Sequence, residues 1–293
     1  MVFMHVPKCG GVAMSHALAA AIRAQNPIVG DMDTTLFGTF AGYDTLALEV
    51  RRRIHFGPLP SGGHHDFVGG HIAASRLFAA YPAARFLTVM REPRIRILSH
   101  YRFWRSTPDE ELPAWGLWAE RVRKARGPLV EFLSDPDLAP QLDNLFTRFL
   151  VLDTAPVPAG FIASSQHAEL LARAIETLGR FDFVDYLENP SIARNVAAWV
   201  GRPFQMRSDN VTMPPRDYPV WLPDEMTPAA RALLEERTAL DRSLWSDLVR
   251  RLTPGLDSAA EADRLLHAYL GEVARRDRAT GRIAAMARSA VPG

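Results

Sequence analysis

The sequence contains a single cysteine, Cys9, among its 293 residues. One thiol excludes an internal disulfide framework and any zinc site built on several thiolates. The sequence also lacks an apolar run of the roughly 18 residues that a membrane-spanning helix needs. Basic and acidic side chains nearly balance, at 34 and 33, which also excludes a protein that coats nucleic-acid phosphates.

Lysine is almost as scarce as cysteine. Lys8 and Lys124 are the two lysines, and arginine supplies the other 32 of the 34 basic side chains. A compact ammonium differs from a planar guanidinium, and a loop wrapped around an oxyanion favours the smaller group. Lys8 is therefore a candidate anion-binding residue, with a chance surface lysine as the alternative.

The remaining composition is that of a globular protein. Hydrophobic residues make up 47% and charged residues 23% of a chain long enough for one elaborated α/β domain or two joined ones. The first residues, MVFMHV, contain neither a basic segment nor a cleavage site, so we expect a cytoplasmic protein.

Segments typical of strands and helices alternate along the chain. Apolar segments at 2–6, 66–70, 85–90 and 181–186 predict strands. Helices are predicted at 12–24, 45–54, 74–80, 94–105, 114–126, 128–134, 140–151, 166–178, 191–200, 228–251 and 258–289, and loops at 26–43 and 207–224. This order predicts a three-layer, P-loop-like α/β fold with a mostly parallel central sheet and helices on both faces. We expect a main domain over 1–253, with a helical insertion at about 94–151, and a C-terminal helical extension over 254–293.

Three polar residues directly follow predicted strands. Lys8 comes after the first strand, His71 after the second and Arg91 after the third. The carboxyl ends of parallel strands share one edge of a sheet, and ligands bind in the crevice outside that edge. We therefore expect these three side chains to converge on one site.

The loop after the first strand, HVPKCGGVAMS, suits an anion. Gly10 and Gly11 allow a tight turn that brings backbone N–H groups close to a ligand, and the helix that follows points its positive end there. Lys8 precedes the glycines, so the loop is not the G-x-x-x-x-G-K-[ST] motif of nucleotide triphosphatases. Arg91 can hold a second phosphate through two hydrogen bonds, and Ser99 can add a hydroxyl. The alternatives are a plain connecting turn and solvated arginines.

V-P-K-C-G-G near the start and M-R-E-P-x-x-R-x-x-S-H-Y about 80 residues later together resemble the sulfotransferases. More narrowly, they resemble the branch that contains the heparan sulfate 2-O-sulfotransferases and their bacterial relatives. The resemblance covers roughly residues 2–250 and implies 3′-phosphoadenosine 5′-phosphosulfate (PAPS) as donor and adenosine 3′,5′-bisphosphate (PAP) as product. It implies a 5′-phosphosulfate loop of Pro7, Lys8, Cys9, Gly10 and Gly11, continued by Val12, Ala13 and Ser15. Arg91 and Ser99 match the ligands of the 3′-phosphate, and His71 matches the catalytic base.

Weaker matches to the family follow at 143–144, 147–148, 181–184, 210–212 and 240–242. Two places depart from the family. Val12 and Ala13 stand where the family usually has hydroxyl side chains for the 5′-phosphate, which leaves Ser15 as the nearest hydroxyl. Gly69 stands where the heparan enzyme has a second histidine.

The implied reaction is the in-line transfer of a sulfuryl group to an acceptor hydroxyl. We expect Lys8 to stabilise the departing bridging oxygen and His71 to accept the proton of the hydroxyl. A purely structural hydrogen bond is the alternative for His71. No metal is expected, because the other nearby histidines lack the spacing of a metal site. Those histidines are His55, His64 and His65.

Residues 101–126 interleave three tryptophans with five arginines, and such a segment suits a sugar or an anionic glycan. From it, Arg102 and Trp104 are predicted to bind the acceptor. Asn144 and Arg148 lie one turn apart on a predicted helix and are expected to line the same pocket. The alternative is that the tryptophans pack the inserted helices and the arginines face solvent. The arginines at 275–282 predict a solvated face or a contact in a homo-oligomer.

Two other functions stay open. A P-loop-like kinase using Mg·ATP needs a metal-binding Asp at a strand end and a Ser or Thr after the loop lysine, where this sequence has Arg91 and Gly10-Gly11. A PAPS- or PAP-binding protein with little turnover is compatible with Val12 and Ala13.

Overall fold

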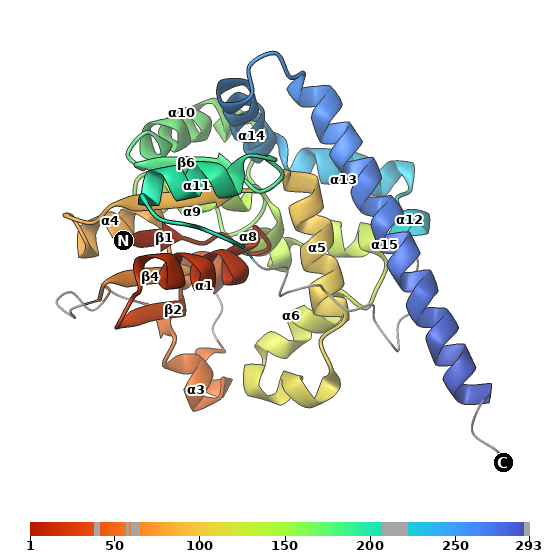
Figure 1. The fold of residues 1–293 in the computed structure, drawn as a ribbon. Coiled ribbons are helices and arrows are strands. Elements are labelled where there is room, and N and C mark those ends of the chain that lie inside the picture. Colours follow the sequence, from red (N-terminus) through yellow and green to blue (C-terminus); the bar gives the residue numbers. More distant parts are fainter. Residues whose placement is uncertain (38–41, 57–58, 60–64, 207–221, 290–293) are drawn as a thin grey trace.

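The computed structural model describes residues 1–37, 42–56, 59, 65–206 and 222–289. At its centre lies a six-stranded sheet whose neighbouring strands are parallel, in the order β3-β2-β4-β1-β5-β6 (Figure 1). The strands are Val2–Met4 (β1), Pro27–Asp33 (β2), Ile54–His55 (β3), Phe67–His71 (β4), Phe86–Met90 (β5) and Phe183–Tyr186 (β6). The predicted α/β class is confirmed.

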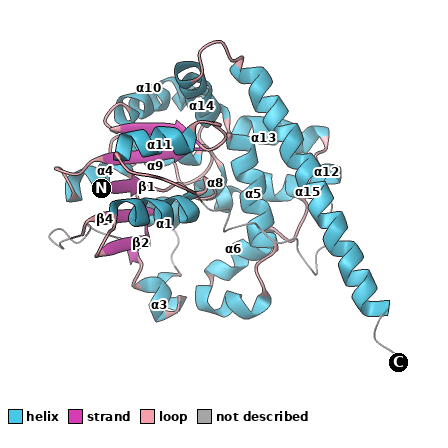
Figure 2. Cartoon of the chain, viewed as in Figure 1, coloured by secondary structure: helices cyan, strands magenta, loops and turns pink. Residues whose placement is uncertain are grey.

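Helices flank the sheet, as Figure 2 shows. The first nine in chain order are Gly11–Ile22 (α1), Thr34–Phe37 (α2), Leu48–Arg51 (α3), Ala74–Ala80 (α4), Pro93–Arg105 (α5), Trp118–Lys124 (α6), Leu129–Ser134 (α7), Ala139–Leu142 (α8) and Leu145–Val151 (α9). They are followed by His167–Leu178 (α10), Ile192–Val200 (α11), Leu222–Glu225 (α12), Pro228–Arg237 (α13), Ala239–Leu252 (α14) and Ser258–Ser289 (α15). Short 3-10 helices lie at Tyr43–Thr45, Asp109–Trp115, Pro136–Leu138 and Ser164–Gln166.

Strand β1 is buried on both faces. Phe3 packs with Met14 of α1 and Val196 of α11, whereas Val2 and Met4 belong to the larger apolar cluster on the opposite face. Successive side chains of a strand point to opposite faces, so a strand covered by helices on both sides needs apolar residues throughout. This burial explains why the start of the sequence is an unbroken apolar run.

Helix α5 begins almost directly after β5. The Glu92 carboxylate accepts hydrogen bonds from the backbone N–H of Ile95 at 2.8 Å and from Arg94 Nε at 2.7 Å. Pro93 takes the first helical position, where an N–H has no partner within the helix. Because the helix starts here, Arg91 stays in the short connection at the carboxyl end of the strand.

The prediction of a loop over 26–43 is wrong where β2 lies, and the helix predicted over 45–54 is replaced by the short helix α3 and strand β3. Strand β2 contains Gly30 at φ 88°, and its pairing with β4 shifts register between Val29 and Asp31. Such an irregular strand carries glycine and aspartate at positions where a regular strand has apolar residues. Its composition therefore resembles that of a loop.

Two predicted helices are split in the structure. The segment at 140–151 breaks into α8 and α9 at Asn144, which has a φ of 47°, and the segment at 228–251 breaks into α13 and α14 at Thr238. The loop predicted at 207–224 lies outside the described residues except for its last residues, which begin α12. The long helix predicted at 258–289 is present as α15, and it packs against α5, α12 and α14 (Figure 1).

A buried polar cluster joins the split helices. The side-chain oxygen of Asn144 accepts a hydrogen bond from the backbone N–H of Leu240 at 2.8 Å. The Asp241 carboxylate accepts from the N–H of Phe146 at 2.9 Å, the N–H of Thr147 at 2.8 Å and the Thr147 hydroxyl at 2.7 Å. Asp241 therefore satisfies backbone donors at the start of α9 from the first turn of α14.

We predict that Asp241→Ala lowers the free energy of unfolding by about 3 kcal/mol, because three buried donors lose their acceptor. Urea unfolding followed by circular dichroism measures the change. The matched control is Asp247→Ala on the same helix, whose carboxylate is 42% exposed and pairs, among the described residues, with two exposed arginines. Its expected change is within about 0.5 kcal/mol. Equal effects of the two substitutions would contradict the role given to Asp241.

Candidate functional site

The structure brings together the three strand ends that the sequence singles out. Strands β4, β1 and β5 are neighbours in the sheet, and His71, Lys8 and Arg91 lie at or just beyond their carboxyl ends. Arg91 Nη1 donates a hydrogen bond to the Lys8 carbonyl oxygen at 3.0 Å. The loops after β1 and β5 are therefore in direct contact.

The loop between β1 and α1 leaves backbone donors free for a ligand. Lys8 and Gly10 have φ values of 69° and 72°, the left-handed conformation that turns the chain sharply into the helix. Gly10 caps α1 without a side-chain hydrogen bond, and the first turn contains no acidic residue. The N–H groups of this turn and the positive end of the helix dipole are available to an anion.

Gly11 is required by the packing of His5. A Cβ atom on Gly11 would lie 1.7 Å from Cδ2 of the His5 ring, far inside van der Waals contact. The imidazole of His5 therefore packs directly against the backbone at the start of α1. The second glycine of the loop serves this close approach, whereas the first serves the turn.

The Lys8 side chain faces an aromatic ring. Its ammonium lies 4.1 Å from the centre of the Phe103 ring on α5 and pairs with no carboxylate of the described residues. Burial, with a further contribution from the Arg91 charge, lowers the pKa of Lys8 to about 8. An anion at this place would both pair with the ammonium and reverse part of that shift.

Arg91 is held between the loop and an acidic residue. Its Nε lies 3.6 Å from a carboxylate oxygen of Glu188 and has no hydrogen-bond partner among the described residues. Burial raises the pKa of Glu188 to about 7, although the Arg91 charge opposes this. Near neutral pH, a substantial share of Glu188 is therefore protonated, and the positive charge of Arg91 is only partly compensated.

The orientation of His71 is fixed by one hydrogen bond. Its Nδ1 lies 2.6 Å from the His5 carbonyl oxygen, which can only accept, so Nδ1 carries the proton and Nε2 keeps its lone pair. Burial, with the Lys8 charge, lowers the pKa of His71 to about 4. The imidazole is neutral at pH 7 and presents one free basic nitrogen.

Two further histidines lie close to Lys8, and the sequence analysis missed both. The His5 ring centre is 4.3 Å from that of His71. His100 is 5% exposed, packs on Trp104, and neither ring nitrogen has a hydrogen-bond partner in the described part of the chain. Burial lowers the pKa of His100 well below its usual value, and the Lys8 charge lowers it further. The signals were present in the sequence, because His5 precedes the loop and His100 follows Ser99.

The remaining loop residues have structural roles. Cys9 is buried, and burial raises the pKa of its thiol to about 12, so the sulfur is not a nucleophile. Ser15 is 1% exposed, and its hydroxyl oxygen lies 2.9 Å from the place of a Cβ on Gly69. Ser15 therefore faces the sheet, and its binding of the 5′-phosphate stays a prediction. Val12 is 43% exposed and, as a valine, has no hydroxyl, and the buried hydroxyl of Ser15 is directed to the sheet.

The four predicted acceptor-binding residues have contacts within the protein, and their role in binding an acceptor stays a prediction. Arg102 makes two hydrogen bonds to the Asp277 carboxylate, at 2.8 and 2.9 Å, and Trp104 is buried among aromatic rings. Arg148 pairs with the Asp143 carboxylate at 2.8 Å and donates to three carbonyl oxygens. Asn144 belongs to the polar cluster of α9 and α14. Arg102, Arg148 and Asn144 use polar atoms in bonds to the protein, and Trp104 packs on aromatic rings, so the structure favours packing as their role.

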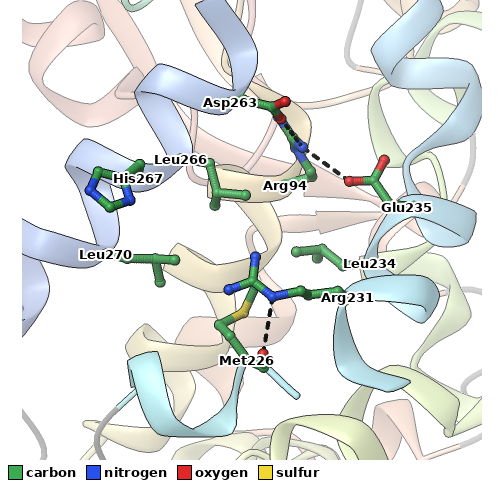
Figure 3. A pocket seen from close by; sticks show the side chains of 9 residues that line it. All are labelled: Arg94, Met226, Arg231, Leu234, Glu235, Asp263, Leu266, His267 and Leu270. Carbon is green, nitrogen blue, oxygen red and sulfur yellow. Dashed lines mark hydrogen bonds and ion pairs between the residues drawn. The ribbon is translucent and has the colours of Figure 1, made fainter. Parts of the chain in front are cut away.

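A cavity lies beside the candidate site around Lys8 and Arg91, not within it. A cavity of about 460 Å³ opens between the start of α5, α13 and α15 (Figure 3). Its lining residues are Arg94, Met226, Arg231, Leu234, Glu235, Asp263, Leu266, His267 and Leu270. Arg94 is paired with Glu235 at 3.0 Å and with Asp263 at 2.8 Å, so its charge is compensated. The cavity contains none of the predicted site residues.

The histidines considered for a metal site have separate partners. His55 pairs with Asp31 at 2.8 Å, and His65 lies 3.2 Å from the Asn26 carbonyl oxygen. No group of three or more His, Cys, Asp or Glu residues in the described ranges could hold a metal ion. His64 lies outside these ranges. Among the described helices, none is long and apolar enough to cross a membrane.

A scan against protein-family models and a search of curated proteins both gave no match. The functional interpretation therefore depends on the motifs and on the arrangement of residues around Lys8.

We predict that this site makes the protein sensitive to acid. The folded protein keeps His71 neutral down to a pKa of about 4, whereas an unfolded histidine binds a proton near pH 6.5. Its contribution to stability is present above pH 6.5 and is lost as the pH falls from 6.5 towards 4. Urea unfolding at pH 7 and pH 5 should show this loss, and His71→Gln should reduce it by about 2 kcal/mol.

His16→Gln is the control for this measurement, because His16 is an exposed histidine on α1. Its substitution should leave the difference between pH 7 and pH 5 unchanged. If His71→Gln also left the difference unchanged, His71 would not be held neutral by its surroundings.

Proposed function

We propose that the protein transfers a sulfuryl group from PAPS to a hydroxyl group of an acceptor. The observation that carries the proposal is the contact between Arg91 and Lys8 at neighbouring strand ends, with Arg91 Nη1 3.0 Å from the Lys8 carbonyl oxygen. This contact holds the loop that carries Lys8 beside Arg91, and the Arg91 charge acts on the Lys8 ammonium. Two cationic side chains from neighbouring loops suit the two phosphate groups of a doubly phosphorylated adenosine. The family that the motifs resemble favours a carbohydrate as the acceptor.

The unpaired donors of the site support an anionic ligand. The first turn of α1 has no side-chain cap, Lys8 faces a ring, and Arg91 Nε lacks a hydrogen-bond partner within the described residues. Buried donors are usually satisfied, so a group of unpaired donors at one strand edge is the pattern that a bound anion completes. PAPS would bring phosphate and sulfuryl oxygens to these donors.

In this proposal, His71, Lys8 and the loop N–H groups have separate roles in the transfer. PAPS supplies an electrophilic sulfur and a phosphate leaving group. His71 Nε2 takes the proton of the acceptor hydroxyl as its oxygen bonds to sulfur and the bond from sulfur to the bridging oxygen breaks. Lys8 and the loop N–H groups stabilise the negative charge that develops on the departing oxygen of PAP.

A second candidate is a protein that binds PAPS or PAP with little turnover. It is favoured by the 5′-loop, where Val12 and Ala13 replace hydroxyl side chains and Ser15 faces the sheet. Each missing hydrogen bond to a charged group would cost about 1.5–3 kcal/mol. Transfer of labelled sulfate to a panel of glycans, lipids and small alcohols separates the two candidates.

The kinase alternative has less support. A Mg·ATP enzyme needs a carboxylate free to bind the metal at the strand edge. Asp33 ends β2 at this edge, but it is buried, and its oxygens accept from the N–H groups of Thr35 at 2.8 Å and Ala73 at 2.7 Å. Calorimetry with PAP and with Mg·ATP separates the two functions, and we expect binding of PAP.

We predict that Lys8→Ala reduces the rate of sulfuryl transfer on the order of 10²–10³-fold, the loss typical of one transition-state donor. His71→Ala should also reduce the rate. The matched control is Lys124→Ala, which removes the other lysine of the chain, one paired with Asp135 at 2.6 Å and Asp137 at 3.0 Å on the surface. Near-native turnover in both Lys8→Ala and His71→Ala would refute the mechanism.

The pKa of Lys8 also predicts how PAP binding depends on pH. Lys8 is protonated below its pKa of about 8, so its loss of charge should lower the affinity above pH 8, whereas the ionisation of Glu188 beside Arg91 acts near pH 7. At pH 9 the loss should be up to about tenfold, since about a tenth of the free protein keeps the ammonium. Calorimetry across this range measures the effect, and Lys8→Met should bind weakly with no such dependence. A wild-type affinity that stayed constant to pH 9 would contradict the role of Lys8.

A further inference from the structure

Helix α15 runs along α5 and is fixed to it at two points. Asp263 bonds to Arg94 at 2.8 Å, a contact visible in Figure 3, and Asp277 bonds to Arg102 through both carboxylate oxygens at 2.8 and 2.9 Å. Residue numbers rise together along the two helices between these points, so the helices run in the same direction. These two ion pairs hold this part of α15 beside α5.

Tyr269 lies between these two points and reaches the predicted 3′-phosphate ligands. The centre of its ring is 5.6 Å from the Arg91 guanidinium carbon. Burial raises the pKa of the Tyr269 phenol, and the Arg91 charge and the Ser99 side chain oppose this rise, so both lie near the phenol. The Arg91 guanidinium follows β5, and the Ser99 and Tyr269 hydroxyl groups come from α5 and α15. The three groups therefore lie near one another.

This arrangement is suited to a tetrahedral dianion. Arginine offers two parallel N–H donors, and each hydroxyl can add one more donor on another side of a phosphate. We infer that the hydroxyl of Tyr269 is a ligand of the 3′-phosphate of the nucleotide, a role that rests on the proposed function. Tyr269 lies outside residues 2–250, which carry the family resemblance, so the motifs give no indication of it.

The position of Tyr269 also bears on the missing hydroxyls of the 5′-loop. Val12 and Ala13 offer no side-chain donors at the 5′ end, whereas Tyr269 adds one at the 3′ end. The binding free energy of the nucleotide is therefore weighted towards its 3′-phosphate. The chain should discriminate strongly between PAP and adenosine 5′-monophosphate, which differ only in that group.

Tyr269→Phe tests the inference, because it removes the hydroxyl and keeps the ring against Arg91. Calorimetry should show PAP affinity reduced by about tenfold or more, as expected for one hydrogen bond to a charged group. The affinity for adenosine 5′-monophosphate should be unchanged. Tyr81→Phe is the matched control, since Tyr81 follows the end of α4, the end remote from the strand edge where that helix begins. It should alter neither affinity.

Three results would overturn the inference. Unchanged PAP affinity in Tyr269→Phe, or an equal loss for both nucleotides, would show that the hydroxyl does not contact the 3′-phosphate. Tighter PAP binding would show that Tyr269 blocks the subsite instead. In each of these cases, binding of PAP by the wild-type protein leaves the proposed function standing. Binding of neither nucleotide by the wild-type protein would remove the proposed function and this inference together.

Discussion

The hydrogen bond from the Arg91 guanidinium to the Lys8 carbonyl oxygen joins the two halves of the site. It exists because β1 and β5 are adjacent parallel strands, whose carboxyl ends leave the sheet side by side. The bond uses a backbone acceptor and so leaves the Lys8 ammonium uncommitted. The same guanidinium contacts Glu188 and Tyr269, so the loop after β1, the loop after β6 and helix α15 are all positioned around Arg91.

Burial determines the chemical state of the surrounding groups. Charged forms are costly away from water, so the histidines near the loop are kept neutral, and the pKa of Lys8 falls towards neutrality while that of Glu188 rises. The site therefore combines neutral imidazoles with an ammonium of lowered pKa, and a bound anion would supply the negative charge that stabilises this ammonium. Structural ion pairs such as Arg102 with Asp277 differ, because their charges are already matched.

The sequence was sufficient to predict which residues lie together at the strand edge, but it was insufficient to predict the contacts of the residues expected to bind the acceptor. Lys8, His71 and Arg91 each follow an apolar run, and parallel topology places such residues together without knowledge of side-chain contacts. Arg102 and Arg148 look equally functional in the sequence, yet each is paired with a carboxylate, and Asp277 is 175 residues distant from Arg102. Strand β2 was missed because Gly30 and two aspartates interrupt its apolar pattern, and Tyr269 because it joins the site only when α15 packs on α5.

The two lysines differ in a way that reaches beyond nucleotide binding. Lys124 is paired with two aspartates, which raise its pKa, whereas the pKa of Lys8 is about 8. At pH 7 about a tenth of Lys8 is an uncharged amine, the form that attacks acylating reagents. An amine-selective reagent should therefore prefer Lys8 to Lys124, and Lys8 and the α-amino group of Met1, whose pKa is also lowered by burial, are the amines of this chain that it would modify first.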